Sequence, residues 1–412
     1  MAQLVECLVS AVKGQQVVVE EELLLECLRA LRNLVAGVEE NQWSVAEKVF
    51  KEKRDGFDFW GFCAEGASDS SPLVDTRLRL CTQFLGNLVG KNLRIQREHF
   101  EPLLATLYLL IGSVDHQQVS LLACMPLLSL LQAAPSFTPD QQTSLAASCP
   151  LLLHLLQTAP EEGSDFLHLC IPTLIKSPHL FPLLSSSERA SCLDLILPGG
   201  EEDHLLAVDI PPENLLVLSH DFTLATDGLL TTNMITSLDQ LHPTQVLKMT
   251  QVLAVASGAE EHRQDLQGHR SLVLNTIYLL KMVHGASRSG VEGLSLLGKM
   301  SDTEGAAAGG KVEDGPAFGF LAALVRLLAN LVWGNQSNQD LVGELEGLQL
   351  LLDCTQVDAR NPLVTQWSIL AVKALTENHP TNQAILAGLR RDGAMDGSLL
   401  KELNIQQRSK VS

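Results

Sequence analysis

Two glycine-rich segments are the strongest candidates for chemistry, because each places Gly-Lys at the spacing of a phosphate-binding loop. They are GLSLLGKM (residues 293–300) and GAAAGGKV (residues 305–312). Such a loop needs a Ser or Thr directly after the lysine to bind magnesium, and these positions hold Met300 and Val312. No β-branched strand precedes either segment, so nothing would fix the backbone amides around a phosphate. The sequence therefore predicts no nucleotide cofactor here.

The other chemistry-bearing residues are scattered. Nine cysteines lie at least 18 residues apart, which excludes zinc or redox pairs, and their apolar neighbours indicate buried, reduced thiols. The histidines form no HExxH motif, and His262 and His269 are typical of a solvated polar face. Runs of acidic residues are typical of helix starts and loops rather than opposed carboxylates. We predict no catalytic residue, no metal site, no cofactor and no enzymatic activity.

One candidate modification site stands out. Ser71-Pro72 could accept phosphate from a proline-directed kinase, as could Thr138-Pro139 and Ser177-Pro178. Ser71 is preferred because it lies in AEGASDSSP (residues 64–72), a polar stretch of small residues that is typical of an inserted loop.

Composition and charge narrow the class of protein. The formal net charge of −19 disfavours nucleic acids and anionic membrane surfaces as binding partners, and no membrane insertion is expected. Hydrophobic residues make up 46% of the chain, yet only 12 Phe, 4 Trp and 2 Tyr are present, which favours leucine-rich helices over strands. The apolar runs near 103–111 and 145–156 are shorter than the roughly 18 residues of a membrane span. The first residues lack a basic region and include Glu6, so a cytoplasmic protein is expected.

An internal repeat organises the chain. Four segments share one template, which has two apolar residues three apart, then Gly or Asn, then a terminal Gln: residues 31–42, 85–96, 328–339 and 372–383. The apolar pair shares a helical face, and the Gly or Asn ends the helix. We expect left-handed backbone at the stop residues Gly37, Gly90, Gly334 and Asn378. The next helix should open with Asn41, Asn338 or Asn382 as its N-cap.

The spacing of these segments predicts an all-α, armadillo/HEAT-like superhelical solenoid. Leu328 and Val372 are 44 residues apart, which is one armadillo or HEAT unit, and the 54 residues from Leu31 to Leu85 allow an insertion. Between the clear repeats we predict helices near 101–112, 117–133, 140–157, 163–176, 186–197, 212–240, 243–257 and 262–285. The predicted organisation is helical repeats over 1–286, a flexible Gly-rich loop over 287–316, C-terminal repeats over 317–405 and a tail over 406–412.

These repeats resemble armadillo repeats, and the C-terminal stretch is similar to the ataxin-10 family. The similarity covers residues 320–386, including Asn338-Gln339-Asp340, the helix at 350–354, Asn361-Pro362, Trp367 and Leu375-Thr376-Glu377. Weaker similarity reaches most of the chain, although a family lead-in segment is expected to be missing at the N-terminus. We therefore expect the C-terminal block to be of the ataxin-10 type.

The resemblance implies a non-enzymatic scaffold or adaptor that supports neurite outgrowth and neuronal survival, with roles in cytokinesis and at the centrosome or cilium base. It implies a perinuclear or more generally cytoplasmic location, including the midbody. The implied partners are a G-protein β subunit, O-linked N-acetylglucosamine transferase, a ciliary IQ-motif protein, mitotic kinases and a homo-oligomer of the chain itself. The alternative is an importin- or catenin-like peptide-binding adaptor for transport or adhesion, and a second rival is a regulatory subunit with a nucleotide switch.

A groove along the third helices is the candidate binding site. In peptide-binding armadillo relatives the template Asn holds the partner's backbone, and Asn33, Asn87 and Asn330 match it, while Ala374 does not. The alternative is that these asparagines tie neighbouring repeats together. Where import receptors carry lysine-binding tryptophans, this chain has Arg29, Gln83 and Arg326, so Arg29 and Arg326 could face an acidic peptide. Trp333 and Trp367 are interpreted as packing residues.

Overall fold

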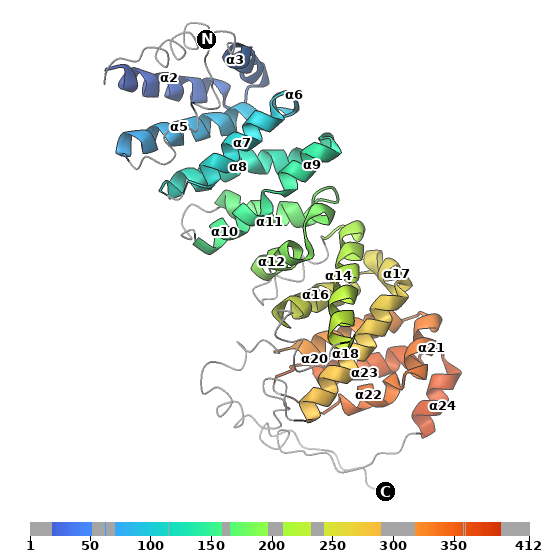
Figure 1. The fold of residues 1–412 in the computed structure, drawn as a ribbon. Helices are drawn as coiled ribbons and strands as arrows, with labels where there is room; N and C mark the ends of the chain where they lie inside the picture. The colour runs from blue at the N-terminus through green and yellow to red at the C-terminus, as the bar shows by residue number, and fades with distance from the viewer. Residues whose placement is uncertain are drawn as a thin grey trace. The chain divides into compact units, whose positions relative to one another are not determined.

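The described chain is helical throughout and divides into two units. The structure, a computed structural model, describes residues 19–51, 62, 71–113, 115–158, 165–196, 209–231, 243–289, 318–356, 358 and 360–388. Within these ranges no residue is in a strand (Figure 1). Residues 1–192 form unit 1 and residues 193–412 form unit 2. The predicted all-α class is confirmed, and each unit stacks its helices as consecutive repeats.

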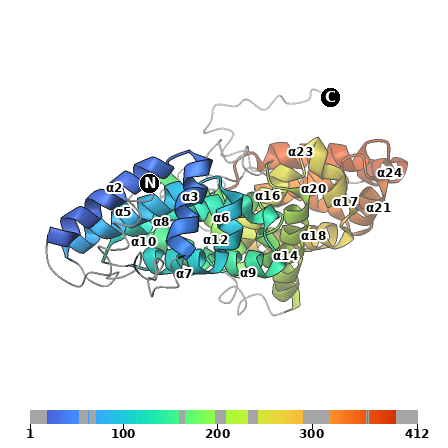
Figure 2. The same cartoon turned by 90° about the horizontal axis from the view of Figure 1, so that it is seen from above.

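Unit 1 is built on a series of long helices that pack one against the next. These are α2 (Val19–Val35), α5 (Pro72–Val89), α8 (Gln117–Ala133) and α11 (Asp165–Lys176), each the last helix of its repeat. Shorter helices fill the intervals: α3 (Glu39–Lys51), α6 (Leu93–Glu98), α7 (Phe100–Ile111), α9 (Pro139–Ala146), α10 (Cys149–Thr158) and α12 (Ser186–Ile196), with 3-10 turns at Ala134–Ser136 and Phe181–Leu183. Figure 2 shows α2, α5 and α8 side by side from above.

Unit 2 repeats the same pattern. Its stacked third helices are α16 (Pro243–Ala256), α20 (Phe320–Val332) and α23 (Val364–Thr376), with α20 packed between the other two (Figure 1). The remaining helices are α14 (Pro212–Thr231), α17 (Glu260–Gly268), α18 (Arg270–Arg288), α21 (Gln336–Glu344), α22 (Gly347–Asp353) and α24 (Pro380–Gly388). Two of the repeats are thus the triplets α17–α18–α20 and α21–α22–α23.

The stacking explains why α20 is apolar on almost every side. From Leu321 to Val332 only Ala323 and Arg326 are not buried. The α20 face formed by Ala322, Val325 and Ala329 is buried, whereas the corresponding positions of α23, which are Gln366, Ile369 and Lys373, are exposed among the described residues. Two of those three are polar, as expected for the outermost helix of a repeat stack.

Two of the predicted helices are broken where the sequence pattern looked continuous. The prediction of one helix over 140–157 is wrong, because α9 ends at Ala146 and α10 starts at Cys149. Pro150 lacks the N–H that would continue the hydrogen-bond ladder. The prediction of one helix over 262–285 is also wrong. Gly268 ends α17, and His269 leaves the helical conformation with φ −86° and ψ 88° before α18 begins.

The left-handed stops are confirmed at three of four predicted positions. Gly37 (φ 71°), Gly334 (φ 68°) and Asn378 (φ 56°) all have positive φ. Gly90 does not, with φ −55°, and the left-handed residue is Lys91 with φ 59°, one position later. The amide of Gly90 still bonds to the carbonyl of Gly86 at 3.0 Å, which prolongs α5 and moves the turn along the chain.

Parts of the predicted domain organisation lie outside the described residues. These are most of the loop at 287–316, the end of the helix predicted at 212–240, the insertion at 64–70 and the tail at 406–412. At the start of the predicted loop, α18 continues to Arg288. Those boundaries stay predictions.

One described stretch, Gln117–Ser136, has the length and composition of a membrane-crossing helix. Of the apolar window that passes this test, 67% is buried inside the protein, and α8 packs between α5 and α11. The core helix of a stacked repeat meets the same criteria, so the burial favours that interpretation.

Two glycines test the packing of unit 2. A Cβ at Gly347 would collide with the Val342 side chain and lie 2.8 Å from the Val342 carbonyl oxygen. Apart from the backbone of its own helix, a Cβ at Gly285, inside α18, would meet no described atom within 4 Å. Gly347→Ala should therefore destabilise the protein by about 1–3 kcal/mol, whereas Gly285→Ala should stabilise it by up to about 1 kcal/mol. Urea unfolding of both variants checks the opposite signs; equal effects would contradict the packing.

Candidate functional site: inter-repeat amides and the α20–α23 groove

Side-chain amides join helix ends, both between neighbouring repeats and within a repeat. We call the first group the inter-repeat amides: Asn87, Asn330, Asn338 and Asn382. The second group is the glutamines Gln42, Gln267 and Gln339. The last four carbonyls of any helix lack partners within that helix, so a buried helix end needs donors from elsewhere. These side chains supply the donors.

The three glutamines bond forward, from the first helix of a repeat to the end of the third helix of the same repeat. The Nε2 of Gln42 donates to the carbonyls of Asn87 (2.7 Å) and Gly90 (3.2 Å) at the end of α5. The Nε2 of Gln339 donates to the corresponding pair, Ala374 (2.7 Å) and Glu377 (3.2 Å), at the end of α23.

Gln267 makes the same contacts at the end of α20. Its Nε2 donates to the carbonyls of Asn330 (2.9 Å) and Trp333 (2.8 Å). The repeat template did not identify Gln267, because it lies one helical turn later than the template glutamines. The sequence feature that could have identified Gln267 is its place in the last turn of a short polar segment, which follows the helix stop at Ser257-Gly258.

The asparagines bond backward. The Nδ2 of Asn87 donates to the carbonyl of Arg32 at 3.1 Å, and the Nδ2 of Asn330 donates to the carbonyl of Ala254 at 2.9 Å and to Ser257 Oγ at 3.2 Å. The structure thus places both template asparagines in the role given by the repeat-tying alternative. Asn33 is exposed, and its Oδ1 accepts from Arg32.

The predicted N-cap role of Asn41, Asn338 and Asn382 is wrong. Each lies within the first turn of its helix, and its Nδ2 reaches back seven residues to a carbonyl of the preceding third helix: Leu34 (2.8 Å), Leu331 (2.8 Å) and Leu375 (2.9 Å). Asn338 and Asn382 also donate to the carbonyls of Gln267 and Gln339. The actual cap of α21 is Asn335, three residues earlier, whose Oδ1 accepts from the Asn338 amide.

The two candidate arginines have different surroundings. Arg29 is exposed and pairs with Glu26 on its own helix. Arg326 is half-buried, and its guanidinium lies 4.9 Å from the centroid of the Trp367 ring. Burial lowers the pKa of Arg326 from its usual value, which an arginine tolerates without losing its proton. Arg29 belongs to unit 1 and Arg326 to unit 2.

A groove lies between α20 and α23. Its pocket of about 160 Å3 is lined by Ala329, Asn330, Trp333, Trp367, Leu370, Lys373, Ala374 and Glu377. The Trp333 side chain is 52% exposed and its ring is covered by Arg263 at 4.8 Å. Of the two tryptophans interpreted as packing residues, Trp333 instead lies largely at the surface, and Trp367 is partly accessible beside it.

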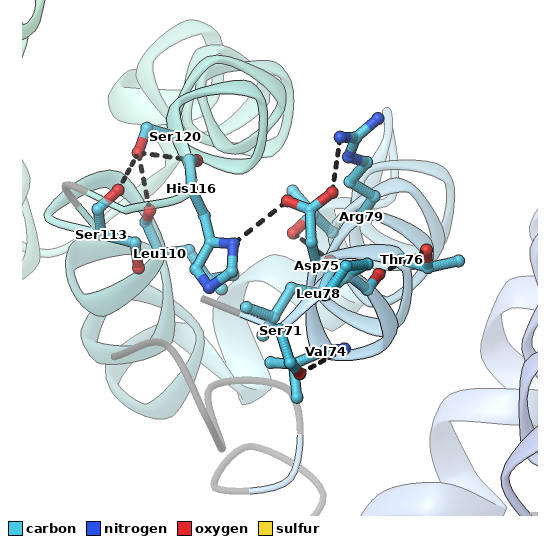
Figure 3. A network of polar contacts seen from close by, with 12 residues as sticks. Ser71, Val74, Asp75, Thr76, Leu78, Arg79, Leu110, Ser113, His116 and Ser120 are labelled. Atoms are coloured by element: carbon cyan, nitrogen blue, oxygen red, sulfur yellow. Dashed lines mark hydrogen bonds and ion pairs between the residues drawn. The ribbon is translucent and has the colours of Figure 1, made fainter. Parts of the chain in front are cut away.

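A polar network surrounds the start of α5 in unit 1 (Figure 3). Ser71 is the N-cap, and its Oγ accepts from the Val74 amide at 3.4 Å. One turn on, Asp75 contacts His116 Nδ1 at 3.1 Å and pairs with Arg79 at 2.5 Å. Burial would raise the pKa of Asp75, but the hydrogen bonds and charges of His116 and Arg79 outweigh it and lower that pKa.

The described cysteines are buried, as predicted, and none of them is in a disulfide. Burial, with the nearby Asp353, raises the pKa of Cys354 to about 12. The contact with Cys149, followed by burial, raises the pKa of Cys192. Protonated thiols are poor nucleophiles and poor metal ligands. Among the described residues, no group of three His, Cys, Asp or Glu side chains could hold a metal ion.

Comparison with known proteins gives a family-model match at the C-terminal end and a weaker similarity over most of the chain. A family model described as the spinocerebellar ataxia type 10 protein domain matches residues 320–411. The chain is 28% identical to ataxin-10 of Xenopus tropicalis over 394 residues, which cover 93% of this chain and 78% of the relative. It is 27% identical to ataxin-10 of Homo sapiens over 94% of this chain and 80% of the relative.

A more distant relative matches a shorter part. The ataxin-10 homolog of Dictyostelium discoideum is 34% identical over 88 residues, covering 21% of this chain and 14% of that protein. A solved engineered protein aligns at a TM-score of 0.35 with 14% identity, which is too low to inform the fold.

Fold and site together define an all-α helical-repeat protein whose repeats are joined by buried side-chain amides. Residues 320–411 of this repeat protein match the spinocerebellar ataxia type 10 protein domain. The chain is similar to ataxin-10 over more than nine-tenths of its length.

The lowered pKa of Asp75 makes a testable contribution to stability. A carboxylate whose folded pKa lies below its usual value of 3.8 stabilises the protein above that value, and the contribution is lost as pH falls through the folded pKa. Asp75→Asn should therefore destabilise unit 1 at pH 7 and have a smaller effect near pH 3. Urea unfolding at both pH values measures this, with Asp115→Asn, an exposed position, as control. An equal loss at both pH values would contradict the assignment.

Proposed function

We propose that this chain is a non-enzymatic scaffold of the ataxin-10 type that binds signalling proteins through its repeat surface. The α20–α23 groove carries the proposal: it offers a pocket of about 160 Å3 with the exposed Trp333 at its edge. By binding two proteins at once, a scaffold raises the local concentration of one for the other.

The partners proposed from family resemblance are a G-protein β subunit, O-linked N-acetylglucosamine transferase, a ciliary IQ-motif protein, mitotic kinases and further copies of the chain. The proposed setting is the cytoplasm, at perinuclear sites, the midbody, or the centrosome and cilium base, in support of neurite outgrowth and cytokinesis. An importin-like adaptor is less well supported, because Arg29, Gln83 and Arg326 stand where lysine-binding tryptophans would be needed. In addition, the Nδ2 atoms of Asn87 and Asn330 already bond within the stack.

Phosphorylation of Ser71 is part of the proposal as a means of regulation. A phosphate at this N-cap would meet the positive end of the α5 dipole, but it would also lie one turn from the carboxylate of Asp75. The balance of these two effects would alter how the start of α5 packs against His116.

The scaffold proposal predicts direct binding without chemistry. The purified full-length chain should co-elute with purified O-linked N-acetylglucosamine transferase or with G-protein β subunit in size-exclusion chromatography. A ligand that binds the folded state raises Tm. Because no nucleotide site is predicted, millimolar ATP or GTP should leave the Tm of the chain unchanged. Separate elution from both partners, or a nucleotide-dependent rise of Tm, would contradict the scaffold assignment.

A further inference from the structure

The pocket between α20 and α23 has largely apolar walls. Trp333, Trp367 and Leu370 form them, and Leu370 is 48% exposed. The pocket volume of about 160 Å3 leaves room for one branched apolar side chain. Burying such a side chain against the two tryptophans would remove apolar surface from water on both partners.

Cationic side chains lie in or next to the walls of this pocket. Lys373 lines it, as does one carboxylate, that of Glu377. Arg263 and Arg326 stack on Trp333 and Trp367, at 4.8 and 4.9 Å from the ring centroids, so each guanidinium is held against a ring that lines the pocket. Among the described residues, no carboxylate oxygen lies within 4 Å of the charged groups of Arg263, Arg326 or Lys373.

The local charge differs in sign from that of the whole chain. The protein carries a net charge of −19, whereas Lys373 and the two stacked arginines outnumber the single carboxylate of Glu377 at this pocket. A partner with carboxylates next to an apolar side chain would complement both features. A basic partner would meet Arg263, Arg326 and Lys373 and be repelled at this site.

Asn330 adds a feature suited to an extended backbone. Its Nδ2 is used within the stack, but no described residue donates to its Oδ1, and Asn330 lines the pocket. An amide oxygen at the floor of a groove can accept a hydrogen bond from a peptide N–H. The groove thus offers an apolar pocket, cations and a backbone acceptor on neighbouring helices.

From these features we propose that the α20–α23 groove binds an extended acidic protein segment, with one apolar side chain in the Trp333–Trp367–Leu370 pocket and carboxylates at Arg326 and Lys373. This inference rests on the proposed scaffold function and specifies the chemistry of the partner segment. Binding is salt-dependent, because the ion pairs lie at the surface.

The test uses the full chain and a fluorescein-labelled peptide of twelve residues, in which glutamates flank a central leucine. Fluorescence anisotropy should show saturable binding that weakens as salt is raised. Replacing the glutamates by lysine, or the leucine by serine, should abolish or strongly weaken it. A single-stranded oligonucleotide of similar charge should not compete, because it has no apolar side chain for the pocket.

Matched variants locate the binding site. Lys373→Glu and Trp333→Ala change exposed groove positions and should each weaken Kd by about fivefold or more. Arg288→Glu makes the same charge change on α18, at an exposed residue outside the groove, and should alter Kd by less than about twofold. Circular dichroism confirms that each variant is folded.

Several results would overturn the inference: no binding of the acidic peptide, equal binding of the lysine peptide, competition by the oligonucleotide, or equal losses in the Arg288 and Lys373 variants. Failure of the peptide while the chain still co-elutes with its protein partners would reject this groove chemistry and leave the scaffold function standing. Peptide binding without any protein partner would reject the scaffold function instead.

Discussion

The repeat stack depends on how the carbonyl groups at the ends of its buried third helices are satisfied. An α-helix leaves its final carbonyls without internal partners, and α5 and α20 end inside the protein, where water cannot reach them freely. Gln42 and Gln267 supply two bonds each at these ends. Each of these amides therefore links the first and third helices of its repeat while removing the penalty of burying a helix end.

The groove is a consequence of the same arrangement. Because the inter-repeat amides fix the ends of neighbouring third helices, they also fix the register of the side chains that lie between those ends. That register brings Arg326 of α20 over Trp367 of α23, 41 residues later in the chain. The Asn330 amide shows the connection directly: its Nδ2 holds the preceding repeat, while the residue itself lines the pocket toward the following one.

Much of this fold could be predicted from the sequence, since the residue types of the helix-end template themselves favour the end of a helix. Gly37, Gly334 and Asn378 were recognisable as stops because few residues adopt positive φ cheaply. The template could not show that Asn41 and Asn338 bond backward, since that depends on tertiary packing rather than on local propensity. Gln267 was missed for a related reason: donor geometry, not sequence spacing, decides which glutamine reaches α20. The pairing of Arg326 with Trp367 required the inter-repeat register.

The central claim is that single side-chain amides hold the helix ends of the repeat stack together, and Gln339, which links α21 to α23, tests it most directly. Gln339→Met keeps the length of the buried side chain but leaves the carbonyls of Ala374 and Glu377 without its donor, while Gln336→Met alters an exposed residue of the same helix. Hydrogen exchange of the full chain should show α21 and α23 losing protection together in the Gln339 variant, by about 1–3 kcal/mol, and unchanged protection in the control. Normal protection of α23 in the Gln339 variant would contradict the account.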